Sequence, residues 1–386
     1  MDSKRARPLF IGRDPSPFIK NARGDLVERH RHYAGQFGSI SVLTVNGGGL
    51  GTKRAGSGGI IVTGVPGNPL LYLVIGFLEG RAEIKKRGIN VMEAQDSYLC
   101  GWLAFLLASY SRFRGRRMGL VLDVHADTID NPYWNRERLE NPILNYFAKI
   151  LLRKADCVRV VSPGLVEKIA GFGVRRERIV FLPVGTDLEK IKGAGKGRAR
   201  KEGGILFVGR LVKQKNIELL LKAFASLLKK HPGCKLTIVG DGPDREKLEK
   251  MRDGLGLGAG VSFTGLASPE RLEKEYAENA FLVLPSFYEG WGLVIMEAFA
   301  NGMPVVVSGA VSTVNPAVVD METAFVFKDN DADSLCEKME KMLALEPSER
   351  AKMAAKAMGI IREFDIRKTS ERLKEMMDRV AGDAGG

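Results

Sequence analysis

The sequence predicts an α/β protein of two units, each with a mainly parallel sheet covered by helices on both faces. Short apolar runs, typical of buried strands, alternate with stretches of helical periodicity along the 386 residues. That length exceeds what a single hydrophobic core usually serves. A stretch rich in Gly, Lys and Arg within residues 188–203 interrupts the alternation and indicates a flexible linker.

The first unit is expected to cover residues 1–187. Each of its apolar runs is short enough for a strand and is bounded by Gly, Pro, Asn or Asp. The predicted strands span 8–12, 39–45, 59–64, 89–92, 119–124, 157–162 and 179–184, and the predicted helices span 25–37, 68–86, 98–113, 141–154 and 164–172.

The second unit is expected over residues 204–365, and a last helix over 366–381 ends the chain. Gly302 and Pro304 mark the end of the helix that follows the fourth strand of this unit. The predicted strands span 204–208, 235–239, 260–264, 280–284, 303–308 and 324–327, and the predicted helices span 217–230, 291–301, 331–344 and 348–364.

The net charge of +13 is concentrated in the first half of the chain. Residues 1–187 hold 28 Lys and Arg against 17 Asp and Glu, whereas residues 188–386 hold 31 against 29. Basic clusters near Trp102, Phe105 and Phe113 suit anionic lipid headgroups, and general solubility charge is the competing interpretation. No recognition motif accompanies the basic residues, so nucleic acid is not an expected partner.

The compartment is expected to be the cytoplasm. The four cysteines lie far apart in or beside apolar segments, as reduced and buried thiols do. No signal peptide is recognisable at the start, and the most apolar stretches are too short to cross a bilayer. We therefore expect a soluble protein or one that rests on the inner face of the cytoplasmic membrane.

Two glutamates, Glu289 and Glu297, lie around the predicted start of a helix that follows a buried strand. The first N–H groups of such a helix, near Gly290, Gly292 and Leu293, have no intrahelical partner and favour a phosphate. Eight residues at helical rise span roughly 12 Å, about the distance between the two hydroxyl-rich ends of a nucleoside-diphosphate sugar. One carboxylate could then bind the sugar and the other the ribose. An ordinary amphipathic helix with two solvated glutamates is the alternative.

A second polar group follows the first strand of the second unit. Gly209 lets the backbone approach a ligand, and Arg210 and Lys215 stand at the carboxyl end of the strand, where open α/β sheets bind ligands. The planar fork of Arg and the compact charge of Lys together suit a diphosphate. The alternative is two surface cations ahead of the helix over 217–230.

The segment Glu289-Gly-x6-Glu297, followed by Gly302-Met-Pro-Val-Val, resembles the signature of the retaining glycosyltransferases of family 4. The segment with Arg210 and Lys215 is similar to the part of that family that binds the donor diphosphate. The resemblance extends from about Gly119 to the end of the chain and is loose over the first hundred residues. It implies the GT-B architecture, in which two Rossmann-like domains face a central cleft and the last helix packs on the first domain.

The resemblance also implies an activity: retaining transfer of a sugar from a nucleoside-diphosphate sugar to an acceptor hydroxyl. Arg210 and Lys215 would stabilise the departing diphosphate, Glu289 would orient the sugar, and Glu297 the ribose. His125, which ends the strand over 119–124, looks like the family histidine that approaches the transferred sugar. A histidine satisfied inside the core is the competing interpretation. No metal or other cofactor is expected, because these cations and amides can serve the diphosphate.

The first unit departs from the family pattern. Many relatives have a Gly-Gly pair after the first strand, whereas this chain has the single Gly12 followed by Arg13. Either Gly12 serves the phosphates alone or Arg13 replaces the missing group. The glycine-rich run over 46–51 is expected to be a hairpin loop and not a phosphate loop. Asp96 either lines the acceptor side or caps the helix that follows it.

Two other functions remain open from the sequence: a nucleotide-sugar epimerase on the same fold, and a non-catalytic nucleotide-sugar-binding protein. The residues do not fix the donor base, the sugar or the acceptor. The basic, aromatic-bearing first half favours a lipid-linked or cell-envelope saccharide as the acceptor, with peripheral contact to the membrane.

Overall fold

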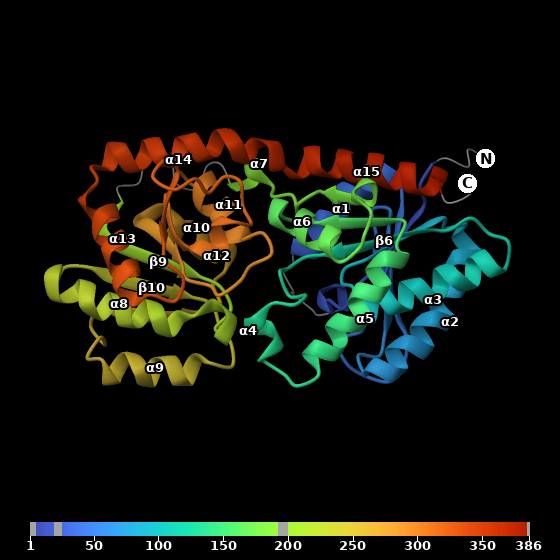
Figure 1. Cartoon of the computed structure of the whole chain (residues 1–386), viewed down its shortest axis with the longest axis horizontal. Coiled ribbons are helices and arrows are strands. Elements are labelled where there is room, and N and C mark those ends of the chain that lie inside the picture. The colour runs from blue at the N-terminus through green and yellow to red at the C-terminus, as the bar shows by residue number, and fades with distance from the viewer. Residues whose placement is uncertain (1–4, 19–24, 192–199, 384–386) are drawn as a thin grey trace. The chain divides into compact units, whose positions relative to one another are not determined.

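The computed structural model of the chain describes residues 5–18, 25–191 and 200–383. They form two compact units: unit 1 comprises the residues up to Gly185 and those from Ile366 onward, and unit 2 comprises Thr186–Asp365. Each unit has one sheet with helices packed on it (Figure 1). The predicted α/β class is therefore confirmed.

The sheet of unit 1 has the order β3-β4-β2-β1-β5-β6-β7-β8. All neighbours pair in parallel except β3 and β4. The parallel interior strands are buried and apolar, while β3 is exposed throughout. The strands are β1 (Pro8–Ile11), β2 (Ile40–Val45), β3 (Lys53–Ser57), β4 (Ile60–Val65), β5 (Val91–Ala94), β6 (Gly119–Val124), β7 (Cys157–Val160) and β8 (Ile179–Phe181).

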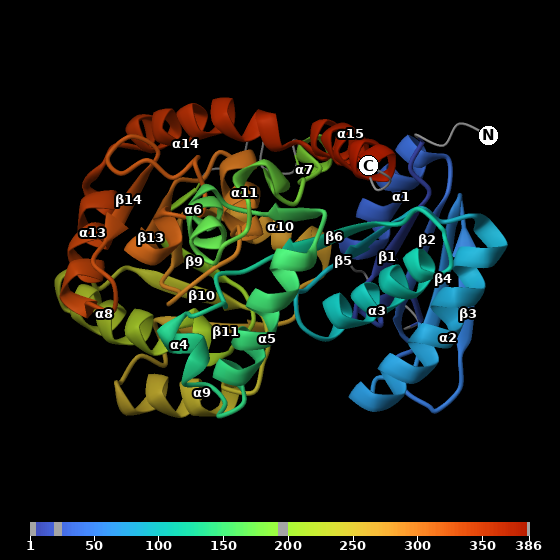
Figure 2. The ribbon, with the colours of Figure 1, turned by 45° about the vertical axis from the view of Figure 1, so that its right-hand side comes forward.

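Helices cover both faces of this sheet. On one face, α2, α3 and α5 form a layer in which α3 contacts both neighbours (Figure 2). On the other face, α1 packs against α15, which brings the end of the chain back to unit 1. The helices are α1 (Asp25–Phe37), α2 (Pro69–Arg87), α3 (Leu99–Phe113), α4 (Pro132–Asn135), α5 (Asn141–Lys154), α6 (Pro163–Gly171) and α15 (Ile366–Asp383).

The apolar face of α15 explains its place in unit 1. Leu373, Met377 and Val380, spaced three or four residues apart, are buried in a cluster with side chains of α1 and of the strands. Gly119 at the start of β6 makes room for the helix, because a Cβ there would lie 2.6 Å from Cγ1 of Val380.

Unit 2 contains a fully parallel sheet in the order β11-β10-β9-β12-β13-β14. Its strands are β9 (Lys201–Val208), β10 (Lys235–Val239), β11 (Val261–Gly265), β12 (Asn279–Leu284), β13 (Val305–Ser308) and β14 (Ala324–Phe327). Its helices are α7 (Leu188–Ile191), α8 (Ile217–Lys230), α9 (Arg245–Gly254), α10 (Pro269–Glu278), α11 (Leu293–Ala300), α12 (Gly309–Ser312), α13 (Ala332–Ala344) and α14 (Pro347–Ile361). Short 3₁₀ turns lie at Lys213–Lys215 (η3) and Arg362–Phe364 (η4).

The chain passes between the units twice, and the two crossing segments are joined. The amide of Thr186 donates to the carbonyl of Phe364 at 3.2 Å, and Thr186 forms a parallel bridge with Asp365. Gly185 is required where the segments meet, because a Cβ there would lie 2.0 Å from Oγ1 of Thr369.

The linker expected over 188–203 is wrong at both of its ends. Residues 188–191 form α7, whose Leu188 is only 2% exposed, and β9 begins at Lys201, before the expected start at residue 204. Residues 192–199 lie outside the described residues. Helix α7 was not predicted, because one buried leucine beside charged residues gives no periodic signal.

Three other local expectations also need correction. Residues 46–51 join β2 to β3 and do not form a hairpin loop, since β2 pairs with β4 and the hairpin turn lies at Gly58 and Gly59, between β3 and β4. The exposed strand β3 and the helices α4, α10 and α12 were not predicted. Helix α11 begins at Leu293, two residues later than expected.

All four cysteines are buried free thiols, as predicted. Among the described residues, no helix combines the length and the apolar character that a membrane span requires.

Candidate functional site

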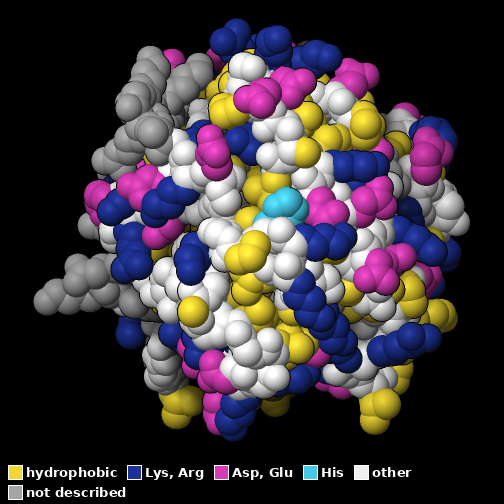
Figure 3. Space-filling model, turned by 90° about the vertical axis from the view of Figure 1, so that its left-hand side faces the viewer, with side chains coloured by type: hydrophobic (Ala, Val, Ile, Leu, Met, Phe, Trp, Pro, Cys, Tyr) yellow, Lys and Arg dark blue, Asp and Glu magenta, His cyan; other side chains and the backbone are white. Residues whose placement is uncertain are grey.

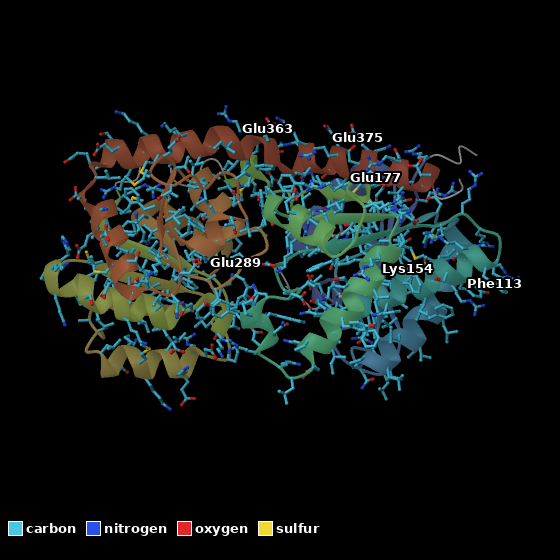
Figure 4. The ribbon with its side chains drawn as sticks, viewed as in Figure 1. Phe113, Lys154, Glu177, Glu289, Glu363 and Glu375 are labelled. Atoms are coloured by element: carbon cyan, nitrogen blue, oxygen red, sulfur yellow. The ribbon has the colours of Figure 1, made fainter. Side chains whose placement is uncertain are left out.

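Glu289 lies in the loop between β12 and α11 and is only 6% exposed (Figure 4). Its Oε1 accepts two hydrogen bonds, one from Nζ of Lys215 at 2.5 Å and one from Oγ of Ser286 at 2.6 Å. Within the described residues, no hydrogen bond reaches its other oxygen, Oε2. The carboxylate is therefore fixed through one oxygen and keeps the second as an acceptor.

The loop that carries Glu289 is held by the η3 turn that carries Lys215. The amide of Phe287 donates to the carbonyl of Gln214 at 2.9 Å, and Nε2 of Gln214 donates to the carbonyl of Tyr288 at 2.8 Å. From β13, Oγ of Ser308 donates to the carbonyl of Ser286 at 2.7 Å. These bonds tie the ends of three parallel strands together, so the separation of Lys215 from Glu289 is set by the sheet.

Helix α11 starts four residues after Glu289. Gly292 is its N-cap residue with a φ of 73°, a left-handed conformation that costs glycine little. The amides of Leu293 and Val294 are in the first turn, and within the described residues neither has a backbone acceptor outside the helix. This turn provides N–H donors and the positive end of a helix dipole beside the Glu289 loop.

Arg210 stands at the carboxyl end of β9 with an exposed side chain. Among the described residues, its guanidinium has no hydrogen-bond or ion-pair partner. The backbone beneath it is closely packed, because a Cβ on Gly240 would lie 1.9 Å from the carbonyl oxygen of Gly209, and one on Gly242 would lie 2.3 Å from that of Leu211. Gly209 thus packs closely against the loop after β10, and the Arg210 guanidinium is available to an anionic ligand.

Glu297 lies on α11, partly buried, and its Oε2 accepts a hydrogen bond from the hydroxyl of Tyr276 at 2.7 Å. Burial, together with this carboxylate, raises the pKa of Tyr276 well above its usual value, so the phenol keeps its proton and donates. Glu297 is therefore oriented from α10. The length of roughly 12 Å expected between the two glutamates assumed helix throughout, whereas only the segment from Leu293 onward is helical.

His125 follows β6 in unit 1, and its Nε2 lies 3.0 Å from Oδ2 of Asp123. Burial and the positive charges of Arg159 and Arg29 lower the pKa of His125 to about 3, so the imidazole is neutral at physiological pH. A neutral ring that donates from Nε2 to Asp123 leaves Nδ1 as an acceptor.

Asp123 belongs to a buried network that spans three neighbouring strands. Nη1 of Arg159 on β7 lies 2.7 Å from Oε1 of Glu93 on β5 and 3.3 Å from Oδ2 of Asp123 on β6. Burial and the neighbouring Asp123 raise the pKa of Glu93 to about 8. Burial raises the pKa of Asp123 as well, although Arg159 opposes the shift. One shared proton leaves one negative charge to match the single guanidinium of Arg159.

Two family models match the chain. One, described as glycosyl transferase 4-like domain, matches residues 31–185, and the other, described as glycosyl transferases group 1, matches residues 191–358. The chain belongs to the group 1 glycosyltransferases. The enzyme therefore transfers a sugar from a nucleotide sugar, and the described polar groups of unit 2 are the candidates for binding it.

The relatives of this glycosyltransferase differ in what they act on. An alpha-D-kanosaminyltransferase of Streptomyces kanamyceticus is 28% identical over 264 residues, which cover 65% of this chain and 68% of that protein. An alpha-monoglucosyldiacylglycerol synthase of Streptococcus pneumoniae is 26% identical over 248 residues, which cover 61% of this chain and 55% of that protein.

Solved structures show the same fold over the whole glycosyltransferase. Sucrose-phosphate synthase from Thermosynechococcus elongatus has a TM-score of 0.77 at 21% identity and covers 97% of this chain and 98% of that one. HepE from Anabaena, in complex with UDP and glucose, has a TM-score of 0.76 at 18% identity and covers 97% of this chain and 100% of that one. The architecture is GT-B, as the sequence resemblance implied.

Both backbone groups of Gly12, which was expected to bind a phosphate, already form hydrogen bonds within unit 1. The amide of Gly12 donates to the carbonyl of Leu43 at 2.9 Å, and its carbonyl accepts from the hydroxyl of Tyr72 at 2.8 Å. Two alternatives were open for this position. Gly12 has no free amide to offer a phosphate, which disfavours the alternative in which Gly12 serves alone. Arg13 is exposed, and its Nη2 donates to the carbonyl of Gly67 at 3.1 Å.

Asp96 caps the helix that follows it in the glycosyltransferase. Its Oδ1 accepts from the amide of Tyr98 at 2.8 Å and from that of Cys100 at 3.1 Å. Of the two roles that the sequence left open, helix capping is the one the structure contains.

The site of unit 2 brings Lys215, Glu289, Arg210 and the first turn of α11 to one edge of the sheet, while Glu297 lies one helical turn further on. Ser286 and Tyr276, which hold the two glutamates, were not predicted from the sequence. The network behind His125 was not predicted either, although charged residues inside the buried strands β5, β6 and β7 were a signal for it. Within the described residues, no group of three or more His, Cys, Asp and Glu is arranged to hold a metal ion.

Proposed function

We propose that the enzyme is a retaining glycosyltransferase that moves a sugar from a nucleoside-diphosphate sugar to an acceptor hydroxyl without a metal ion. The observation that carries the proposal is the fixed pair of Lys215 and Glu289 at 2.5 Å, four residues before the first turn of α11. A cation, a carboxylate and free amides then occupy one strand edge. This is the set of groups that an anionic diphosphate and a polyhydroxylated sugar need together.

The proposed step proceeds on one face of the sugar. The bond between the anomeric carbon and the diphosphate oxygen breaks, and the acceptor oxygen bonds to that carbon from the same side. The departing phosphate oxygen takes the proton of the acceptor hydroxyl, and the products are the nucleoside diphosphate and the glycoside. Arg210, Lys215 and the amides of Leu293 and Val294 stabilise the negative charge that develops on the leaving group.

The two glutamates have separate roles in this proposal. Glu289 keeps Oε2 as the acceptor for a hydroxyl of the transferred sugar, while Ser286 and Lys215 hold its Oε1. Glu297 accepts from a ribose hydroxyl, and Tyr276 prevents its carboxylate from turning away. His125 forms hydrogen bonds to sugar hydroxyls as a neutral imidazole. Neutrality matters because a charged imidazole would raise the free energy of an oxocarbenium-like sugar.

The acceptor that we propose is a lipid-linked or cell-envelope saccharide, met at the cytoplasmic face of the membrane. The excess of positive charge in residues 1–187 supports this choice, with 28 Lys and Arg against 17 Asp and Glu. A relative that synthesises alpha-monoglucosyldiacylglycerol, a sugar attached to lipid, also supports it.

The donor is tested first by thermal shift with UDP, GDP and ADP sugars, and then by turnover with the donor that stabilises the protein. Arg210→Ala and Glu289→Gln are each expected to reduce kcat by roughly 100-fold or more, with the fold intact. The matched controls are Lys213→Ala, an exposed cation on the η3 turn, and Glu246→Gln, an exposed carboxylate on α9. The controls should retain full activity, and unchanged turnover in both site variants would reject the site.

Product analysis distinguishes the proposal from the other functions. Retention predicts that the new glycosidic bond has the anomeric configuration of the donor, which one-dimensional NMR reports. Turnover of the donor to a different nucleotide sugar without acceptor would instead indicate an epimerase. Donor binding with neither transfer nor hydrolysis would indicate a non-catalytic protein.

A further inference from the structure

Helices α2 and α3 form a closely packed pair on unit 1. Gly76 and Gly80 of α2 allow this approach: a Cβ on Gly76 would lie 2.7 Å from Cδ2 of Leu103, and one on Gly80 would lie 2.6 Å from Cδ1 of Leu107. The pair is therefore fixed with one defined side toward solvent (Figure 2).

The solvent side of this pair carries several exposed apolar side chains. On α2, Leu70, Val74 and Leu78 recur every four residues and are 69%, 52% and 56% exposed. On α3, Leu106 is 43% exposed, and Phe113, at the end of the helix, is 88% exposed (Figure 4). We call these five residues the apolar face. Exposed apolar side chains that recur along one side of a closely packed helix pair indicate an interaction site.

The same side of the pair becomes strongly basic at the C-terminal ends of the helices. A hollow of about 400 Å³ is lined by Arg81 and Lys85 of α2, and by Arg114 and Arg116 after α3. No carboxylate lines it, and within the described residues none of these four side chains has an ion-pair partner. We call the four the cationic pocket. Leu78 of the apolar face also lines it, so the two features are continuous.

The geometry of the pocket suits a phosphate group. Arg81 is held in place, because its guanidinium lies 4.7 Å from the ring centroid of Tyr110. The two carboxylates of α2 are already paired: Glu83 with Arg87 at 2.6 Å, and Glu79 with Arg54 at 2.9 Å. Four cations without counter-charge attract an anion, and Arg forms paired hydrogen bonds with phosphate oxygens.

Unit 2 provides a contrast. Over the end of unit 2 that Figure 3 shows, Lys and Arg are interspersed with Asp and Glu, and hydrophobic side chains appear in small scattered groups. Residues 188–386 carry 31 Lys and Arg against 29 Asp and Glu. The unbalanced charge thus belongs to the first half of the chain, where α2 and α3 carry the apolar face and the cationic pocket.

We propose that the apolar face and the cationic pocket together dock the enzyme on an anionic lipid bilayer, with the pocket binding the phosphate of a headgroup. The apolar face enters the boundary between headgroups and acyl chains, while the pocket stays at the depth of the phosphates. This inference rests on the proposed function for its purpose, since docking brings the enzyme to lipid-linked acceptors. Its physical basis is independent of the donor site.

The test is co-sedimentation of the full chain with vesicles of phosphatidylcholine alone and of phosphatidylcholine mixed with phosphatidylglycerol. We expect binding only to the mixed vesicles, and weaker binding as salt rises. Replacing Arg81, Lys85, Arg114 and Arg116 by Gln should reduce the partition coefficient by roughly 100-fold or more, at about fivefold per cation. The doubly substituted Leu70→Ser/Phe113→Ser enzyme should also lose binding, at unchanged net charge.

The matched control replaces Lys222, Lys229, Lys328 and Lys352 of unit 2 by Gln, which removes the same charge from exposed positions. This control should bind the mixed vesicles almost as well as the parent enzyme. Equal losses in the control and the pocket variant would overturn the proposal in favour of general charge. Equal binding to both kinds of vesicle would overturn the headgroup assignment.

Two further experiments test other binding partners for this surface. Titration with glycerol phosphate reports a soluble phosphate: pocket-dependent binding of it, without any binding to vesicles, would overturn the docking proposal. Size-exclusion chromatography reports a second copy: a dimer that Leu70→Ser/Phe113→Ser dissociates, again without vesicle binding, would assign the apolar face to self-association.

Turnover with a water-soluble acceptor is measured for every variant. Variants that lose vesicle binding and keep this turnover isolate the docking surface from the donor site. If the enzyme binds vesicles but shows no turnover, the proposed function is wrong and the docking proposal still holds.

Discussion

Nζ of Lys215 lies 2.5 Å from Oε1 of Glu289, although 74 positions separate them in the sequence. The pair links the cation that we assign to the diphosphate with the carboxylate that we assign to the sugar. Binding of the diphosphate and orientation of the sugar are therefore coupled through one contact.

The first prediction is that substitutions of Lys215 and Glu289 have non-additive effects on the free energy of unfolding. Lys215→Met leaves the Glu289 carboxylate, 6% exposed, without its cation, and we expect this to reduce the free energy of unfolding by about 3 kcal/mol. The double variant Lys215→Met/Glu289→Gln should recover part of that loss. Urea unfolding of the four proteins in the cycle measures the coupling.

Lys213→Met is the control for this cycle, since Lys213 lies on the same turn and is exposed. It should change the free energy of unfolding by less than about 0.5 kcal/mol. Strict additivity of the Lys215 and Glu289 substitutions would show that the pair contributes nothing to stability.

A second prediction concerns the buried acid Glu93, whose pKa is raised to about 8. The folded protein retains a proton there that the unfolded chain releases near its ordinary pKa of 4.5. The associated stability is fully present below pH 4.5 and is lost as the pH rises through 8. The loss amounts to at most about 1.4 kcal/mol per pH unit in that window.

Glu93→Gln should remove this loss, because the amide keeps the shape and a donor toward Asp123 but does not titrate. We therefore expect the variant to gain stability relative to the parent protein between pH 5 and 8, as measured by urea unfolding at several pH values. Parallel stability curves for the two proteins across that range would contradict the assigned protonation.

The third prediction concerns His125, whose pKa is lowered to about 3. The folded state favours the neutral ring, so the contribution of His125 to stability increases with pH, whereas that of Glu93 decreases with pH. Stability is fully present above pH 6.5 and is lost as the pH falls through that value toward 3. His125→Asn should flatten the acid side of the stability curve.

The same neutral ring predicts the behaviour of His125 in catalysis. No inflection of kcat/KM near pH 6.5 should come from this residue, and the imidazole signals in NMR should stay those of the neutral form down to about pH 4. A titration of His125 near its ordinary pKa would show that its surroundings do not favour the neutral ring.

A fourth prediction concerns the close packing of two loops beneath Arg210. Gly240→Ala would put a Cβ 1.9 Å from the carbonyl oxygen of Gly209, at a φ of 132° that side chains rarely adopt. We expect a fall in Tm of several degrees and a loss of the thermal shift caused by the donor nucleotide. Gly233→Ala is the control, since a Cβ there has open space within 4 Å.

The elements of the fold were largely predictable because their signals are local. Strand β6 and helices α5 and α8 have the predicted bounds, since apolar runs and helical periodicity depend on neighbouring residues. Strand β3 was missed because all five of its residues are exposed. A strand that pairs at an edge and buries nothing leaves no pattern in the sequence.

The candidate site was also predictable only in its local features. The residue types of Arg210, Lys215, Glu289 and Glu297, and their places at the ends of strands or on a helix, were readable because strand ends can be inferred from short-range pattern. The hydrogen bond from Ser286 to Glu289 and that from Tyr276 to Glu297 required the structure. The hydrogen bond that occupies the amide of Gly12 also required the structure, since the sequence left open whether Gly12 or Arg13 serves the phosphates.

The sequence by itself determined the α/β class, the order of the main elements and the chemistry available at the strand ends, because these follow from periodicity, glycine and charge within a few residues. Only the tertiary structure decided which groups share a partner. The pairing of strands placed Arg159 between Glu93 and Asp123, and the packing of loops placed Lys215 on Glu289. Distances between residues far apart in the chain depend on how whole elements pack, and no local pattern encodes them.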